Sequence, residues 1–304
     1  MSLAEPLLIG DARIDRLVDL ERFELPLGWL FPDATLAALQ DDLSWLEPDF
    51  LTGDKAILAI QSTVLRVGGR TILIDTCVGE HKPRPRHPAW NQRRHTGYLD
   101  RLGALGIAPE AVDIVFCTHL HADHVGWNTR IDNGRWVPTF PNARYLMGRH
   151  ELSDWETKLK TAPADMVNHG SYADSILPVI DAGRADLIDH DHQLLDGLVV
   201  RRLPGHTPGS IGLSMHRHGG RCLFTGDSIH HPVQLIHPAW SSSLCSDPQL
   251  ARATRTHYLA EAAENGTWLV PAHFAGHTGV QICRHANAYR PILGNCHAAA
   301  GRLP

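Results

Sequence analysis

The segment THLHADHVGWN, residues 118–128, carries a dense group of metal-binding side chains directly after a short apolar run. It contains His119, His121, Asp123 and His124 within six positions. Residues two apart in an extended segment project to the same side, so His119 and His121 can hold one ion while Asp123 and His124 face a neighbouring position. The alternative is a solvated histidine patch. Three imidazoles and a carboxylate after a buried strand are, however, typical of a transition-metal site.

Three further candidate ligands follow apolar runs in the second half of the chain. His206 lies in PGHTPG, Asp227 in TGDS and His273 in VPAHF. Layered α/β folds gather their functional residues at the ends of strands. We therefore expect four separate stretches of sequence to supply one cluster.

The two halves of the chain share a similar order of hairpin, helix and strand, which predicts two sheets with helices outside. The first fifty residues contain a plausible strand pair around 12–25 and little evident chemistry. The expected strands cover 57–67, 71–74, 114–116, 144–147, 194–203, 211–215, 222–225 and 268–270, and the expected helices cover 98–105, 149–160 and 248–265. Residues 161–176 show no regular pattern.

Composition excludes several classes of protein. The 304 residues are 43% hydrophobic and 20% charged, with no apolar run near the ~20 residues that a membrane-spanning helix needs. A net charge of −5 gives no general attraction to nucleic acid. Glu5 stands where a secretory signal would carry positive charge, so we expect a cytoplasmic protein.

The HxHxDH motif and the later Gly-His, Gly-Asp and terminal His motifs, in this order, resemble the metallo-β-lactamase-fold hydrolases over about residues 57–276. The resemblance implies an α/β protein built as a four-layer αβ/βα sandwich, with a dinuclear site at one edge of the two sheets. We expect a single domain over residues 1–304, with 1–55 as an amino-terminal flank and 277–304 as a carboxy-terminal tail.

The resemblance also implies the roles of the candidate residues. Two divalent ions, Zn²⁺ first and Mn²⁺ or Fe²⁺ as alternatives, would convert a shared water to hydroxide and hydrolyse an ester-like bond. Asp123 could also handle a proton for the leaving group, and Asp75 would orient a ligand imidazole or simply cap its strand. The implied ligands are His119, His121 and His206 for the first ion, Asp123, His124 and His273 for the second, and Asp227 as a bridge.

The substrate is less well defined than the ligand set. A lactone, as in quorum-quenching lactonases, is our first expectation, although His230 replaces the tyrosine that those enzymes have three residues after the bridging aspartate. His230 could donate a hydrogen bond to the oxyanion or be an ordinary loop histidine. The segment GDSIHHPVQ, residues 226–234, resembles instead the organophosphate- and aryl-ester-cleaving branch of the methyl parathion hydrolase type. A non-catalytic, metal-binding member of the fold is a further alternative.

Two features outside the ligand motifs bear on the partner. Trp90, Trp127, Phe140 and Trp240 could form the wall of an apolar pocket. The basic loop at 81–94 could cover the cleft and attract an anion, or be a solvated face. The expected partner is a small ester, lactone or phosphotriester, without nucleic acid or membrane, and a homodimer is compatible with the sequence.

Overall fold

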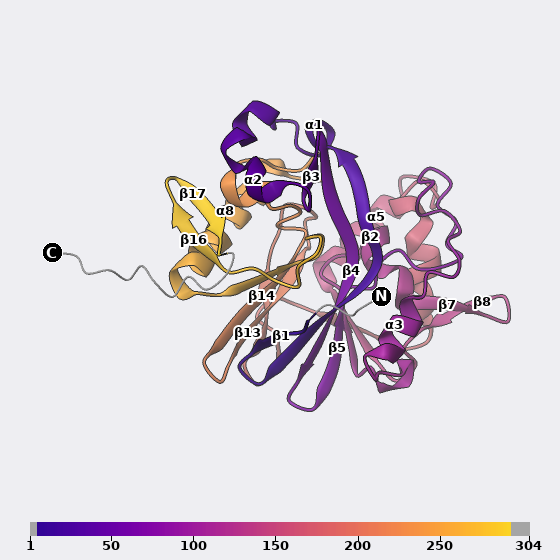
Figure 1. Cartoon of the computed structure of the whole chain (residues 1–304). Helices are drawn as coiled ribbons and strands as arrows, with labels where there is room; N and C mark the ends of the chain where they lie inside the picture. The colour runs from indigo at the N-terminus through magenta and orange to yellow at the C-terminus, as the bar shows by residue number, and fades with distance from the viewer. Residues whose placement is uncertain (1–4, 293–304) are drawn as a thin grey trace.

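The apolar run near residue 60 forms a long strand of the larger of the two main β-sheets, and two separate hairpins form small two-stranded sheets. The computed structural model describes residues 5–292 (Figure 1). Within this sheet, the neighbouring strands Arg70–Ile74, Ile114–Phe116, Arg144–Gly148 and Ala185–Ile188 pair in parallel, whereas the other neighbours pair antiparallel. The strand order is β1 (Leu7–Ile9), β2 (Ala12–Pro26), β4 (Lys55–Val67), β5 (Arg70–Ile74), β6 (Ile114–Phe116), β9 (Arg144–Gly148) and β10 (Ala185–Ile188), with β3 (Leu51–Thr52) paired to β4.

The second sheet packs against the first through apolar side chains of both. Phe116 and Leu146 of the first sheet share a buried cluster with Val200, Leu213 and Phe224 of the second. Burial of each such side chain contributes about 1.5–3 kcal/mol, so this interface holds the sheets face to face. The order is β11 (Gln193–Leu195), β12 (Leu198–Arg202), β13 (Ile211–Arg217), β14 (Gly220–Gly226) and β15 (Trp268–Pro271).

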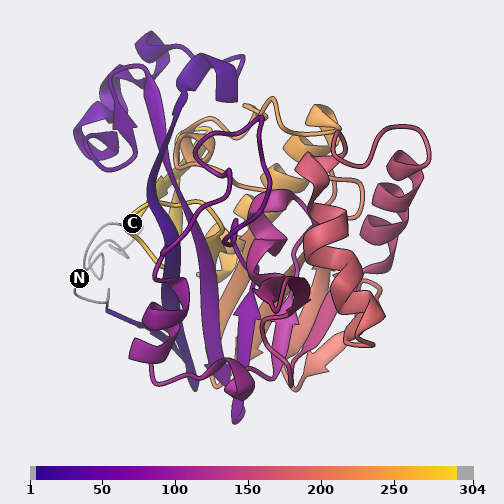
Figure 2. The same cartoon turned by 90° about the vertical axis from the view of Figure 1, so that its right-hand side faces the viewer.

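Helices cover the outer face of each sheet, as Figures 1 and 2 show. Over the first sheet lie α3 (Tyr98–Ala104), α5 (Arg149–Leu159) and α6 (Leu177–Asp181), and over the second lies α8 (Pro248–Asn265). Asp247 caps α8 by accepting a hydrogen bond from the Leu250 amide. The predicted four-layer αβ/βα sandwich is confirmed.

Short elements fill the connections between these layers. Those that matter for the site are α4, which carries two of the candidate ligands, and α1, which follows β2 at the open edge of the sheets. Their bounds are α1 (Leu27–Leu30), α2 (Leu43–Leu46), α4 (Ala122–Val125), α7 (Val233–Ile236), β7 (Thr129–Asp132), β8 (Arg135–Pro138), β16 (Ile282–His285) and β17 (Ala288–Pro291).

Several expected boundaries are wrong. The strand pair expected around 12–25 is the single strand β2, which pairs with β1 and β4. The strand expected at 194–203 is divided into β11 and β12, because Gly197 adopts a φ of 71° and turns the chain. Strand β10 was not expected, and the segment expected to be irregular ends in a π-helix at Tyr172–Ile176.

The expected carboxy-terminal tail is partly folded. Strands β16 and β17 form a hairpin, and Tyr289 packs in the cluster beneath α8. The rest of that tail, residues 293–304, lies outside the described residues. Across residues 5–292, no helix combines the length and the apolar character required to cross a membrane.

Candidate metal centre

Loops at one edge of both sheets bring the seven candidate ligands together. The loop after β6 carries His119 and His121 and leads into α4, which contains Asp123 and His124. The other three come from the second sheet, where His206 lies between β12 and β13, Asp227 follows β14, and His273 follows β15. Strands β14 and β15 are parallel, so their carboxyl ends meet at this edge.

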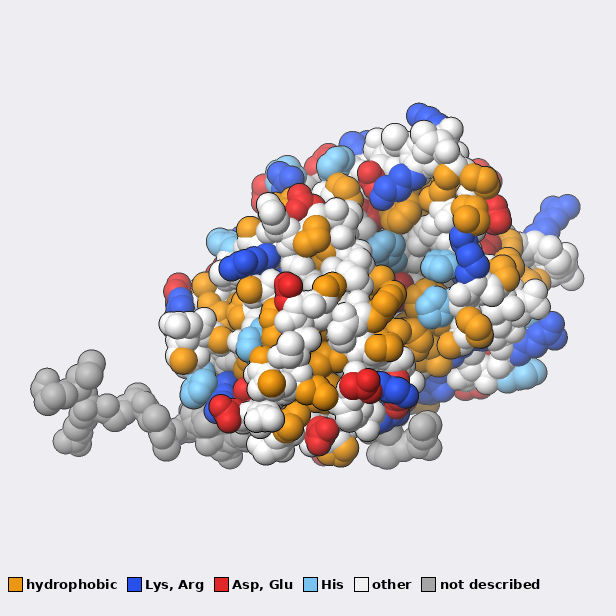
Figure 3. Space-filling model, turned by 90° about the horizontal axis from the view of Figure 1, so that it is seen from above, with side chains coloured by type: hydrophobic (Ala, Val, Ile, Leu, Met, Phe, Trp, Pro, Cys, Tyr) orange, Lys and Arg blue, Asp and Glu red, His pale blue; other side chains and the backbone are white. Residues whose placement is uncertain are grey.

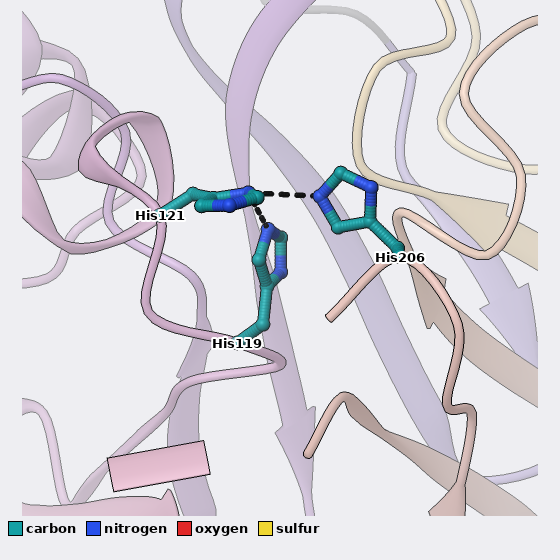
Figure 4. Close-up of side chains that lie close together, drawn as sticks. All are labelled: His119, His121 and His206. Atoms are coloured by element: carbon teal, nitrogen blue, oxygen red, sulfur yellow. Dashed lines mark hydrogen bonds between the residues drawn. The ribbon is translucent and has the colours of Figure 1, made fainter. Parts of the chain in front are cut away.

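The first group consists of three imidazoles that point toward one another (Figure 4). His121 Nδ1 lies 3.0 Å from His119 Nε2 and 2.8 Å from His206 Nε2. Burial lowers the pKa of each of these three imidazoles. They are therefore neutral near pH 7, which is the form that binds a metal ion.

The second group consists of Asp123, His124 and His273. Asp123 Oδ2 lies 3.8 Å from the Nε2 atoms of both histidines. Burial alone would lower the pKa of His124, but the carboxylates of Asp227, Asp123 and Asp75 raise it well above its usual value. Negative charge at this position therefore favours a positive charge on the ring or beside it.

Asp227 lies between the two groups and turns one oxygen toward each. Its Oδ2 is 3.3 Å from His206 Nε2, and its Oδ1 is 3.1 Å from His273 Nε2 and 3.4 Å from His124 Nε2. Burial would raise the pKa of this carboxyl, but His273, His124 and the other nearby histidines hold it well below its usual value. Asp227 is therefore a carboxylate that faces both groups.

The residues fit a pair of metal ions. His124 Nε2 and Asp227 Oδ1 are buried and have no hydrogen-bond partner among residues 5–292. Buried polar atoms of this kind require an explanation, and a cation between them supplies one. Imidazole nitrogens and carboxylate oxygens form a donor set that zinc, manganese and iron accept.

Most of the histidines in the two groups are oriented by a contact of Nδ1, the ring nitrogen that does not face the cluster. Asp75, at the end of β5, accepts hydrogen bonds from the Thr118 amide and from Thr118 Oγ1, and its Oδ2 is 2.9 Å from His124 Nδ1. The structure thus places Asp75 in the orienting position that the resemblance implies. The other contacts are His119 Nδ1 to Thr118 Oγ1 at 3.1 Å, His273 Nδ1 to the Ala59 carbonyl at 2.8 Å and His206 Nδ1 to Cys245 Sγ at 3.9 Å.

His230 lies beside the first group and is only 1% exposed. Its Nε2 is 3.4 Å from Asp227 Oδ2, and neither ring nitrogen has a hydrogen-bond partner in the described part of the chain. Burial lowers the pKa of His230 to about 4, so the ring is neutral at pH 7 and carries one N–H donor. With His206 and Asp227 it also forms a set that could hold a metal ion.

A cavity of about 310 Å³ opens above the cluster. Figure 3 shows histidine side chains in a hollow surrounded by hydrophobic groups. No lysine or arginine lines the cavity among the residues that the structure describes. Its apolar and aromatic walls are Phe23, Leu25 and Trp29 of the amino-terminal segment, Leu58 and Ile60 of β4, and His87, Trp90, His169 and Leu244 from loops.

The sequence identified this wall poorly. Of the four aromatic residues expected to line a pocket, only Trp90 does so. Trp127 stacks on Tyr98 inside the core, Phe140 is buried there, and Trp240 stacks on His237. The amino-terminal flank, expected to carry little chemistry, supplies three wall residues, and the 53% exposure of Trp29 at the cavity is a signal that only the folded chain reveals.

The basic loop at 81–94 turns its most buried charges away from the cavity. Lys82 and Arg84 are fully buried, and Arg84 donates two hydrogen bonds of 2.6 and 2.8 Å to the carboxylate of Asp174. Lys82 Nζ donates to the Asp174 carbonyl at 2.9 Å, and Arg93 pairs with Asp19. The loop therefore contributes His87 and Trp90 to the cavity wall, and its lysine and arginine side chains do not line the cavity.

A family profile described as the metallo-beta-lactamase superfamily matches residues 57–273. The chain belongs to this superfamily. The cluster of histidines and aspartates lies within the matched region, and the sequence-based expectation of a metal-dependent hydrolase is confirmed at the level of the superfamily. A comparison with curated proteins gives no significant match.

Solved structures of other superfamily members have the same fold. AidC, a dizinc quorum-quenching lactonase solved in complex with a product, is 21% identical with a TM-score of 0.75, over 95% of this chain and 96% of its own. The hydrolase AbOPH is 24% identical with a TM-score of 0.79, over 96% and 97%. A probable metal-dependent hydrolase from Staphylococcus aureus is 15% identical with a TM-score of 0.74, over 95% and 99%.

Proposed function

We propose that this protein is a dinuclear-metal hydrolase that opens the ring of a small, neutral lactone. The observation that carries the proposal is the position of the candidate ligand cluster at the base of a largely apolar cavity, which no lysine or arginine of residues 5–292 lines. Such a cavity excludes water and favours uncharged, hydrophobic substrates. Zinc is our first choice of metal, since the donors are nitrogen and oxygen atoms.

Each ion position takes ligands from both sheets. His119, His121 and His206 would hold the first ion, and Asp123, His124 and His273 the second, with Asp227 shared between them. When bound, two divalent ions lower the pKa of a water molecule toward neutrality and polarise a carbonyl oxygen.

Two side chains are placed to assist this chemistry. Asp123 lines the cavity, and its side chain is 16% exposed, so its carboxylate can accept a proton and pass it to the departing alkoxide. Neutral His230 also lines the cavity and can donate its ring N–H to the substrate carbonyl as negative charge develops on the oxygen.

An aryl ester or phosphotriester is the second candidate substrate. Phe23, His87 and Trp90 form an aromatic group on one wall, with the His87 and Trp90 rings stacked 3.9 Å apart. Aromatic side chains favour contact with an aromatic leaving group. The lactone remains first because AidC, which shares the fold, is a lactonase with a homoserine product bound.

A substrate panel tests the proposal. We expect zinc-reconstituted protein to hydrolyse an acyl-homoserine lactone with a higher kcat/KM than an aryl ester or a phosphotriester. Anionic substrates such as a β-lactam carboxylate or a phosphodiester should react least, because no lysine or arginine of residues 5–292 lines the cavity wall to compensate their charge. A reversed order would contradict the substrate class, and bound zinc without turnover of any compound would favour the non-catalytic alternative.

Replacing His230 with phenylalanine tests its proposed hydrogen bond. We expect turnover to fall about tenfold or more, the effect of losing one donor to an oxyanion. His230→Gln, which keeps an N–H donor, should recover part of the rate. Zinc content should be measured in both variants, since parallel loss of metal and turnover would make His230 a ligand instead, and an unchanged rate would remove it from the mechanism.

A further inference from the structure

A buried carboxylate outside the ligand set joins the two loops that carry the first group of histidines. Glu151 lies in the first turn of α5 and is 1% exposed. Its Oε1 accepts hydrogen bonds from the Leu120 amide at 3.1 Å and from Trp155 Nε1 at 2.7 Å. Its Oε2 accepts a hydrogen bond from Thr207 Oγ1 at 2.7 Å. Each oxygen therefore holds a different loop.

Both bonded loop residues are neighbours of candidate ligands in the sequence. Leu120 lies between His119 and His121, and Thr207 follows His206 directly. The first loop follows β6 of the larger sheet, whereas the second connects β12 and β13 of the smaller sheet. One side chain thus connects the two sheets at the point where three imidazoles converge.

The surroundings of Glu151 fix its own position. A Cβ atom on Gly209 would lie 2.2 Å from the Glu151 nitrogen, so only glycine allows the His206 loop to approach α5 this closely. The Trp155 ring, which donates to Glu151, packs edge-on against His121 with 5.4 Å between ring centroids. The carboxylate, the tryptophan and the ligand imidazole therefore form one packed unit.

We propose that Glu151 is the positioning residue of the first metal position. It is not one of the proposed ligands, but through Leu120 and Thr207 it sets the spacing between the His119–His121 loop and the His206 loop. The inference rests on the metal assignment of the proposed function, not on the choice of substrate. Removal of a side chain that orients metal ligands in this way typically weakens metal affinity about 10- to 100-fold.

Different substitutions of Glu151 remove different parts of this connection. Alanine leaves the Leu120 amide, the Trp155 N–H and the Thr207 hydroxyl without their acceptor. Glutamine can keep its oxygen toward Leu120 and Trp155 and donate its amide to Thr207, whose hydroxyl can accept. Thr207→Val, a change of similar shape, removes the hydrogen bond from the His206 loop to Glu151, together with the bond between Thr207 and Ser210 inside that loop.

Zinc titration of the metal-free protein against a chromogenic chelator measures both positions without using activity. His119→Ala and His273→Ala identify which binding step belongs to the first and second position. We expect Glu151→Ala to weaken the first step about 10- to 100-fold and to leave the second within about twofold. Thr207→Val should weaken the same step by less, and Glu151→Gln least of all.

Tyr145→Phe is the matched control, because it removes a buried hydroxyl, hydrogen-bonded to Phe140 and Asn128, in the strand before α5. It should leave both zinc steps unchanged. Unchanged first-step affinity in folded Glu151→Ala, or equal weakening of both steps, would overturn the proposal. If that variant does not fold, wild-type affinity in Thr207→Val overturns it. Failure of the substrate panel would leave these zinc affinities unaffected.

Discussion

Replacement of Asp227 with alanine is expected to remove turnover and most of the bound metal. The two oxygens of this carboxylate face the two groups of ligands, so both positions lose a donor at once. The substitution also removes the negative charge of the carboxylate, which would offset the charge of a pair of cations. Metal content after dialysis against zinc, together with kcat/KM for the best substrate, measures the effect.

The control for this variant is Asp196→Ala, because the Asp196 side chain is 98% exposed and lies away from the cavity lining. It should keep normal zinc content and activity. Far-UV circular dichroism of both variants shows whether the fold is retained. Full activity in folded Asp227→Ala would refute the proposed centre.

Replacement of Asp174 with alanine is expected to lower the free energy of unfolding by about 3–5 kcal/mol, the cost of removing one partner from a buried ion pair. Lys82 and Arg84 are fully buried against this carboxylate. Burial lowers the pKa of Lys82 to about 7, against the attraction of Asp174, so Lys82 can lose its proton when that partner is removed. Arg84 stays charged and would be left uncompensated. Urea denaturation monitored by tryptophan fluorescence measures the loss.

Asp186→Ala is the comparison for that measurement. Asp186 pairs with Arg144 at the surface, where the two side chains are 45% and 42% exposed. Solvent screens such a pair, so its removal should cost less than about 1 kcal/mol. Equal stability changes in the two variants would show that the buried cluster does not anchor the loop at 81–94.

The sequence predicts which histidines and aspartates come together at the sheet edge, because most of that pattern is local. His119, His121, Asp123 and His124 stand within one short turn, and the ends of later strands mark His206, Asp227 and His273. The layer order follows from hairpins and helices whose apolar periods are also local. The resemblance to a superfamily, now shown by the family match, supplied the assignment of those residues to two ions.

The walls of the cavity could not be predicted in the same way. Whether Trp90 or Trp127 faces the cleft depends on contacts with Phe23 and Tyr98, which come from other segments. The basic loop shows the same limit, because the partner of Arg84 lies 90 residues later in the chain. The composition of the loop suggested an anion site, but Lys82 and Arg84 are buried against Asp174, and their charges hold the loop in place.

The division of the ligands between the sheets makes the centre a property of the complete fold. Each proposed position draws its candidate imidazoles from before and after residue 190, so within residues 5–292 neither half alone contains the full proposed set for either ion. Ions that bind only the assembled sandwich add their binding free energy to its stability. Bound zinc would thus stabilise the association of the two halves. Separation of the sheets would end catalysis and release both ions together.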